Sequence, residues 1–76
     1  MKNLLASIAK QLVDEPEVVK VRELEGNHMS VLELSVARSD LGKVIGVKGR
    51  NINAIRTIMN AASTKIRKRI VVELVE

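Results

Sequence analysis

The sequence predicts a small two-layer α+β domain, in which helices cover one face of a three-stranded sheet. Two observations predict this class. Stretches with helical apolar spacing occur at the start and in the second half of the chain, and three stretches rich in β-branched residues lie between and after them. The expected order is helix, strand, strand, short helix, glycine turn, long helix, strand. With 76 residues, the chain has the length of a single domain, residues 1–76.

The first expected helix covers residues 3–13. Asn3 can cap its start, because a side-chain oxygen there accepts a backbone N–H bond. Pro16 ends the helical stretch, because proline disfavours helical geometry in the residue before it. The apolar residues that recur at helical spacing, and so form the buried face, are Leu4, Leu5, Ile8 and Leu12.

Residues 18–25 and 29–36 alternate between apolar and polar side chains, which is typical of strands. The short polar link between them contains Gly26 and Asn27 and favours an antiparallel hairpin. His28, the only histidine, lies in this link. With no second ligand nearby it is expected to be a turn residue with no metal or acid–base role.

A short helix is expected through residues 41–45, with Ser39 or Asp40 as its cap. Gly46 ends it, since glycine accepts a left-handed backbone conformation. The longest helix is expected over residues 50–65, and residues 70–75 alternate as a third strand. The apolar stripe of the long helix is expected to be Ile52, Ile55, Ile58, Met59, Ala62 and Ile66.

Small residues form one edge of this stripe, where Ala54 and Ala61 lie next to Ile58. Such an edge could accept a second subunit, so these three residues are a candidate dimer interface. The alternative is that Ile58 is peripheral core.

Composition excludes several kinds of site. The chain has no aromatic residue, so the ring-stacking platforms of RRM and OB-type modules are absent. It has no cysteine and therefore no disulfide or thiolate metal site. No long uncharged apolar run is present, so we expect no membrane span and a cytoplasmic location.

The charge of the chain is unevenly distributed along the sequence. Residues 1–37 hold four Lys/Arg against six Asp/Glu, a net charge of −2, whereas residues 38–69 hold nine Lys/Arg against one acid, a net charge of +8. A one-sided basic segment is typical of a protein with a phosphate-bearing partner. An unevenly charged solvated surface is the alternative.

The basic segment contains the glycine turn, residues 46–49, Gly-Val-Lys-Gly. It is not a P-loop, because no Gly-Lys pair is followed by Ser or Thr. The spacing of Gly42, Gly46 and Gly49 does not fit a dinucleotide fingerprint, which also needs a larger sheet. A helix-turn-helix that reads DNA could use Arg50, Asn51 and Asn53, but such domains are usually all-helical.

Residues 44–52, Val-Ile-Gly-Val-Lys-Gly-Arg-Asn-Ile, resemble the I-G-x-x-G-x-x-I core of the K-homology (KH) family. The element order resembles the type II (prokaryotic) KH arrangement over the whole chain. This resemblance implies a groove beside the turn for about four nucleotides of single-stranded RNA. Its aliphatic floor is expected from Val44, Ile45, Ile52 and one side of the second strand. The expected RNA-binding residues are Lys43, Val44, Ile45, Gly46, Val47, Lys48, Gly49, Arg50, Ile52 and Arg56.

Residues 39–46, Ser-Asp-Leu-Gly-Lys-Val-Ile-Gly, and 52–58, Ile-Asn-Ala-Ile-Arg-Thr-Ile, narrow the resemblance to the KhpA family of small bacterial RNA-binding proteins. That resemblance implies self-association as a homodimer and pairing with a larger KhpB/Jag-type KH protein. It also implies RNA-chaperone or post-transcriptional roles and, in some bacteria, a link to cell-wall synthesis and cell shape.

The alternative function is a protein-interaction module whose main role is dimerisation. An enzyme is not expected, because the basic segment has no catalytic constellation of carboxylate, cysteine or histidine. No cofactor is expected either.

Overall fold

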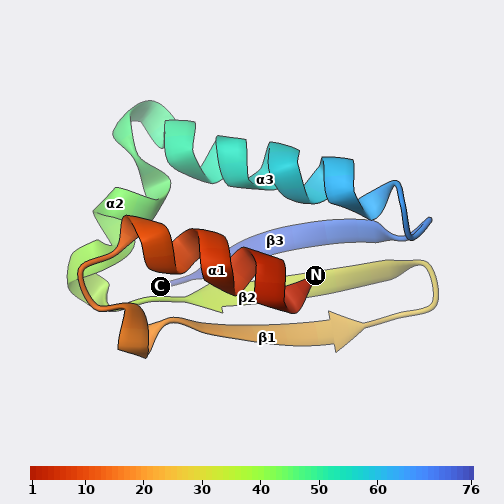
Figure 1. The fold of residues 1–76 in the computed structure, drawn as a ribbon, viewed down its shortest axis with the longest axis horizontal. Helices are drawn as coiled ribbons and strands as arrows, with labels where there is room; N and C mark the ends of the chain where they lie inside the picture. Colours follow the sequence, from red (N-terminus) through yellow and green to blue (C-terminus); the bar gives the residue numbers. More distant parts are fainter.

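The structure is a computed structural model that describes residues 1–76. It is an α+β domain, as predicted, with both longer helices on the same side of one sheet (Figure 1). Three single 3₁₀ turns cover Pro16–Val18, Arg38–Asp40 and Val47–Gly49. The regular elements are α1 (Lys2–Leu12), β1 (Lys20–Glu25), β2 (Met29–Ser35), α2 (Leu41–Ile45), α3 (Arg50–Ser63) and β3 (Arg69–Val75).

The three strands form one sheet in the order β1-β2-β3. β1 and β2 form the predicted antiparallel hairpin, with Val21 opposite Leu34. β3 pairs parallel to β2, with Val72 opposite Leu32. A parallel pair needs a long crossover between its strands, and here the crossover contains α2, the glycine turn and α3. The glycine turn therefore lies at one end of the domain (Figure 1).

The core fills the space between the helices and one face of the sheet. It consists only of Leu, Ile, Val, Ala and Met, as the absence of aromatic residues requires. Alternation along the strands directs every second side chain of β2 and β3 into this layer. The buried apolar residues are Leu5, Ala9, Val19, Leu32, Leu34, Val44, Ile52, Ile55, Met59, Ile70 and Val72.

Two predicted helix termini are wrong in detail. Asn3 does not cap α1, because the helix already begins after Met1 and has no side-chain capping bond. α3 ends at Ser63, earlier than expected, and Arg67 then adopts a left-handed conformation with φ of 55°. Ile66 therefore lies outside the helix and is 49% exposed instead of continuing the apolar stripe. Ser63 is buried in that layer instead, and its hydroxyl donates to the Asn60 carbonyl at 2.7 Å.

The predicted cap of α2 is also wrong. Neither Ser39 nor Asp40 makes a capping bond to this helix. The Asp40 carboxylate is only 1% exposed and accepts bonds from the backbone N–H groups of Asp14 and Glu15, each at 3.1 Å. These bonds, led by the one from Asp14, hold the pKa of Asp40 below its ordinary value of 3.8. Asp40 thus fastens the segment after α1 to the start of α2.

Candidate nucleic-acid interface

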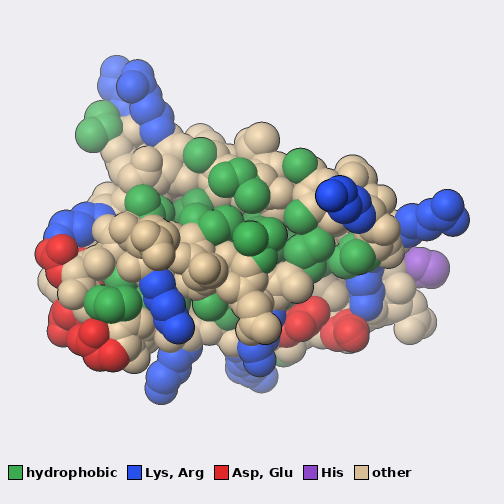
Figure 2. Space-filling view, viewed as in Figure 1, with side chains coloured by type: hydrophobic (Ala, Val, Ile, Leu, Met, Phe, Trp, Pro, Cys, Tyr) green, Lys and Arg blue, Asp and Glu red, His purple; other side chains and the backbone are tan.

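The glycine turn has an unusual backbone. Gly46, Lys48 and Gly49 all have positive φ, at 75°, 56° and 75°. This conformation reverses the chain tightly between α2 and α3. Val47 is left 75% exposed, at the apex of the turn. Lys and Arg side chains project there beside an apolar one, at the upper left of Figure 2.

The two glycines of the turn are required for different reasons. A Cβ on Gly46 would lie 2.7 Å from Asn51 Cγ and 2.9 Å from its backbone nitrogen. A Cβ on Gly49 would meet nothing closer than Asn53 Nδ2 at 3.7 Å. Both residues were expected to bind RNA. At Gly46 a Cβ would overlap the protein itself, whereas at Gly49 it would make only ordinary van der Waals contacts, and the positive φ alone favours glycine there.

Asn51 is a positioning residue that sequence reasoning missed. Its side-chain amide donates to the Lys43 carbonyl at 2.7 Å, across the glycine turn. This bond joins the last turn of α2 to the first turn of α3 and fixes the angle between the two helices. A polar residue directly after the Gly-Arg pair was the only signal in the sequence, and it was interpreted as a possible base contact.

No side chain competes with a ligand for the start of α3. No side chain caps it, and its first turn contains no acidic residue. The first N–H groups of a helix have no partner within the helix, and they carry the positive end of its dipole. The glycine turn therefore lies beside a set of donors suited to an anion.

The cations near the turn differ in their surroundings. Lys43 contacts the carboxylates of Asp14 and Asp40. The bond from its ammonium to Asp14 is the main cause that raises the pKa of Lys43. Lys43 is thus part of the cluster that joins α1 to α2. Lys48 and Arg50 are exposed and take part in none of the four ion pairs of the structure.

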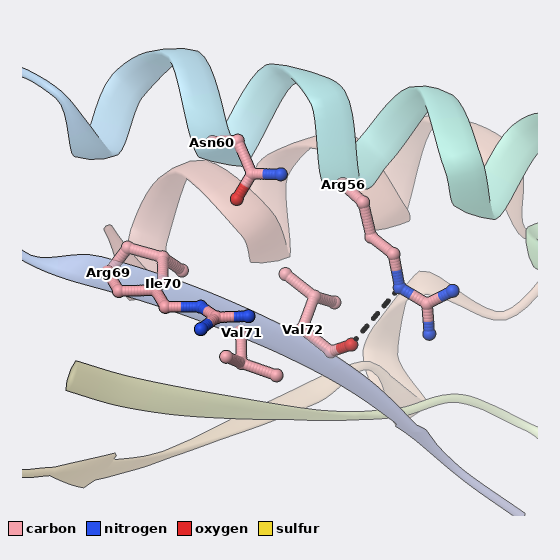
Figure 3. A pocket seen from close by; sticks show the side chains of 6 residues that line it. All are labelled: Arg56, Asn60, Arg69, Ile70, Val71 and Val72. Atoms are coloured by element: carbon pink, nitrogen blue, oxygen red, sulfur yellow. Dashed lines mark hydrogen bonds between the residues drawn. The ribbon is translucent and has the colours of Figure 1, made fainter.

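The expected aliphatic floor divides between core and surface. Val44 is fully buried and Ile52 nearly so, while Ile45 is half-buried. The surface pocket lies further along α3, between this helix and β3, and has a volume of about 230 Å³ (Figure 3). It is lined by Arg56, Asn60, Arg69, Ile70, Val71 and Val72.

The strand that lines this pocket is β3. The second strand, which was expected on one side of the RNA groove beside the glycine turn, does not line it. The reason is the strand order, because β2 is the central strand and β3 the free edge beside α3. Arg56 Nε donates to the exposed edge carbonyl of Val72 at 3.3 Å (Figure 3). Asn60 and Arg69 were not among the residues that the sequence predicted to bind RNA. Only the packing of α3 on β3 brings them together with Arg56.

The candidate dimer residues lie on a different flank of α3. Residues three or four apart share a helix flank, which groups Arg56 with Asn60 and, separately, Ala54 with Ile58 and Ala61. Ile58 is 46% exposed, so it packs partly against the domain and leaves about half of its surface free, which fits a dimer contact and a peripheral core residue alike. Apolar side chains gather on the surface between α3 and α1 in Figure 2.

A family model described as "KhpA/KhpB, KH domain" matches residues 2–74. The chain belongs to this family of KH domains. It is 53% identical over 75 residues to RNA-binding protein KhpA of Clostridium acetobutylicum, covering 99% of this chain and 100% of that one. It is 46% identical over 76 residues to RNA-binding protein KhpA of Chlamydia pneumoniae, covering 100% and 97%.

Among solved structures, Era of Aquifex aeolicus is similar in fold, with a TM-score of 0.64 and 24% identity. The match covers 96% of this chain but only 28% of the Era chain. At that identity the likeness shows the fold alone. Together with the family, it confirms the type II KH-like arrangement that the element order predicted. No helix here combines the length and apolar character needed to cross a membrane.

Proposed function

We propose that this protein binds single-stranded RNA without catalysing a reaction, and that residues 1–76 act as one KH domain. The observation that carries the proposal is the glycine turn, where unpaired Lys48 and Arg50 flank the uncapped start of α3. The names of the relatives support it, since both KhpA proteins compared above are named RNA-binding proteins. Era, the neighbour in fold, has been crystallised with nucleotides 1506–1542 of 16S ribosomal RNA.

The turn would contact the sugar–phosphate backbone. The N–H groups of Gly49 and Arg50 already donate to the Gly46 and Val47 carbonyls, so the donors for a phosphate would be the N–H groups that follow in the first turn of α3. Because Gly49 has no Cβ, a phosphate could approach the start of α3 closely. Lys48 and Arg50 add full positive charges there. Exposed Val47 would pack against a sugar or base, in a position that contributes nothing to the core.

The pocket between α3 and β3 would hold the bases. Without aromatic rings, a base must stack on aliphatic side chains or on a guanidinium plane. Ile70 and Val72 are core residues that are each only 4% exposed, so half-buried Val71 would supply aliphatic atoms and Arg56 the plane. The Arg56 bond to the Val72 carbonyl keeps that guanidinium beside β3 (Figure 3). Contacts of this kind read few base-specific groups, so we expect low sequence specificity.

A test of the proposal is the double substitution Val47→Asp with Lys48→Asp. Both side chains are exposed, so the fold should persist while two negative charges occupy the phosphate site. The measurement is fluorescence anisotropy with a labelled twelve-nucleotide oligouridylate. Binding by the native protein should weaken with salt at a log–log slope of roughly −2 to −3.5, as expected for ~3–5 phosphate contacts. Unchanged affinity in the variant, or a flat salt response, would exclude the glycine turn as the contact surface.

Association with other protein chains is a second part of the proposal. One short module binds RNA weakly, and two linked modules gain affinity through effective concentration. We propose a homodimer through Ala54, Ile58 and Ala61, because exposed Ile58 lies on the flank of α3 away from the pocket. A dimerisation module with secondary RNA binding is the alternative function. In either form, pairing with a KhpB/Jag-type protein fits the name of the family.

The cellular role that we propose follows the resemblance. It comprises a cytoplasmic location, RNA-chaperone or post-transcriptional activity, and a contribution to cell-wall synthesis and cell shape. Identifying the RNAs crosslinked to the protein in its host would test this role directly.

A further inference from the structure

A second group of cations lies at the far end of α3 from the glycine turn. We call it the basic turn and define it by Lys65, Arg67, Lys68 and Arg69. Figure 2 shows Lys and Arg side chains gathered near both ends of this helix. α3 has 14 residues, and at about 1.5 Å per residue the two groups are about 21 Å apart. Cations are common where a helix ends, because they complement its dipole. That general reason does not explain the details of this turn.

The four cations of the basic turn do not have the same role. Lys68 is largely buried against the hairpin, with its ammonium 3.6 Å from the Glu25 carboxylate. Its backbone N–H also donates to the Ser63 carbonyl at 3.5 Å. Lys68 therefore holds the turn in place. Lys65, Arg67 and Arg69 are exposed and take part in none of the ion pairs of the structure.

The backbone at Arg67 favours another residue type. Its φ of 55° places it in the left-handed region, next to the bond that closes the helix end. Glycine is the usual residue at such a position, because it has no Cβ to strain the conformation. Non-glycine residues in this region cluster at functional sites. Here the chain carries a guanidinium where folding alone favours glycine.

The basic turn is continuous with the pocket. Arg56 lines the pocket at the middle of α3, and Arg69, the first residue of β3, lines it next to the turn. The Arg69 side chain extends along the pocket in Figure 3. A strand that leaves the glycine turn and lies in the pocket is therefore directed toward Arg67 and Lys65.

We propose that the basic turn is a second phosphate-binding site for the same single strand of RNA, which extends the bound length beyond four nucleotides. This second site rests on the proposed function, RNA binding, and specifies how long a strand of RNA the protein binds. Phosphates of a fully stacked strand advance by roughly 3.4 Å per nucleotide, so about 21 Å corresponds to at most about six steps. A strand that reaches from the glycine turn to the basic turn passes the whole pocket and extends beyond the four nucleotides expected at the glycine turn alone.

The test compares the native protein with the variant that combines Lys65→Gln and Arg67→Gly. Glycine suits the backbone at position 67, so this variant loses two charges without a cost in folding. The control variant combines Lys10→Gln and Lys20→Gln, which removes two exposed charges from α1 and β1. The probes are oligouridylates of four and of twelve nucleotides, titrated while the backbone amide signals of the protein are followed by NMR. The longer probe offers about nine registers for a four-nucleotide site, so its affinity is compared after this statistical correction.

We expect the native protein and the control to prefer the longer probe by more than about ninefold. The Lys65/Arg67 variant should bind the longer probe roughly fivefold more weakly and the shorter probe as the control does. Amide signals of the basic turn should shift only with the longer probe. The inference is overturned if the variant and the control lose equal affinity, or if the corrected affinities for the two probes are the same. If the native protein binds neither probe, the proposed function itself fails.

Discussion

Replacement of single glycines by alanine separates what the glycine turn does for folding from what it does for binding. Gly46 has φ of 75° and ψ of 172°, in a region that is essentially restricted to glycine. Alanine there costs roughly 1–3 kcal/mol in backbone strain. The contacts of its methyl group with Asn51, at 2.7 and 2.9 Å, cost roughly 1–3 kcal/mol more. Since one of those atoms is the Asn51 backbone nitrogen, a side-chain rotation cannot relieve the overlap.

Alanine at Gly49 has a smaller cost. The conformation is left-handed, with φ of 75° and ψ of 15°, which costs an alanine roughly 1–2 kcal/mol. No atom lies closer than 3.7 Å to the added methyl group. Reduced freedom of the unfolded chain returns roughly 0.4–1 kcal/mol. We therefore expect Gly49→Ala to lose about 1 kcal/mol, and Gly46→Ala to lose roughly 2–5 kcal/mol, out of a total stability of roughly 4–11 kcal/mol for a chain of this length.

The assay is urea denaturation followed by circular dichroism, with Gly42→Ala as the control. Gly42 lies within α2, and its added methyl group would meet nothing within 4 Å. We expect this control to gain roughly 0.5–1 kcal/mol from the better helix propensity of alanine. Equal losses at Gly46 and Gly49 would refute the reasoning, because the contact with Asn51 would then have no energetic weight.

The effects of these substitutions on RNA affinity should differ from their effects on stability. Gly49→Ala keeps the fold, because its methyl group overlaps no atom, but the methyl group lies where a phosphate would approach α3. We expect a loss of about tenfold in affinity for the twelve-nucleotide probe, the equivalent of one charge-assisted hydrogen bond. Gly42→Ala should bind as the native protein does. Native affinity in Gly49→Ala would mean that no phosphate enters this space.

Two further predictions concern groups away from the glycine turn. The folded pKa of Asp40 is lowered, so its contribution to stability is present above 3.8 and is lost as pH falls through the lower folded value. Asp40→Asn should be less stable than the native protein at pH 7 but should lose less stability on acidification. The measurement is the urea midpoint of both proteins between pH 2 and 7. Parallel plots of midpoint against pH would contradict this role of Asp40. The ion pairs of Lys43 depend on pH in the opposite direction. Because the folded pKa of Lys43 is raised above 10.5, their contribution to stability is complete below pH 10.5 and is lost as pH rises through the folded value. Ile58→Asp should be a folded monomer in analytical ultracentrifugation. Its basic residues should still bind the shorter probe. A native protein that is itself monomeric at every concentration would exclude the dimer.

The secondary structure and the glycine turn could be predicted from local patterns. The alternation of residues 29–36, the helical spacing after Arg50 and the position of Gly46 each depend on side chains close in sequence. Errors appeared where a distant partner decides the outcome. Asp40 was predicted to cap α2, yet its partners are Asp14 and Glu15, which lie 26 and 25 residues away. Ile66 was assigned to the apolar stripe because periodicity does not reveal where the helix ends.

The candidate site shows the same division. The sequence shows the cations around Gly46 and Gly49, but it does not show which of them form ion pairs with carboxylates. The structure engages Lys43 with two carboxylates and leaves Lys48 without an ion pair. Such pairing depends on how α1 packs beside α2, which no local pattern contains.

By itself, the sequence determined the order of the elements, the aliphatic composition of the core and a glycine turn beside positive charge. These features follow from steric preferences and from the periodicity of apolar residues, which act over a few residues. The tertiary structure alone decided that β3 pairs parallel to β2 at the edge of the sheet. That pairing places Arg69 and Val72 beside Arg56 and forms the pocket. The physical reason is that strand order is set by burial of the whole core, so residues distant in sequence become neighbours only once the sheet and helices pack together.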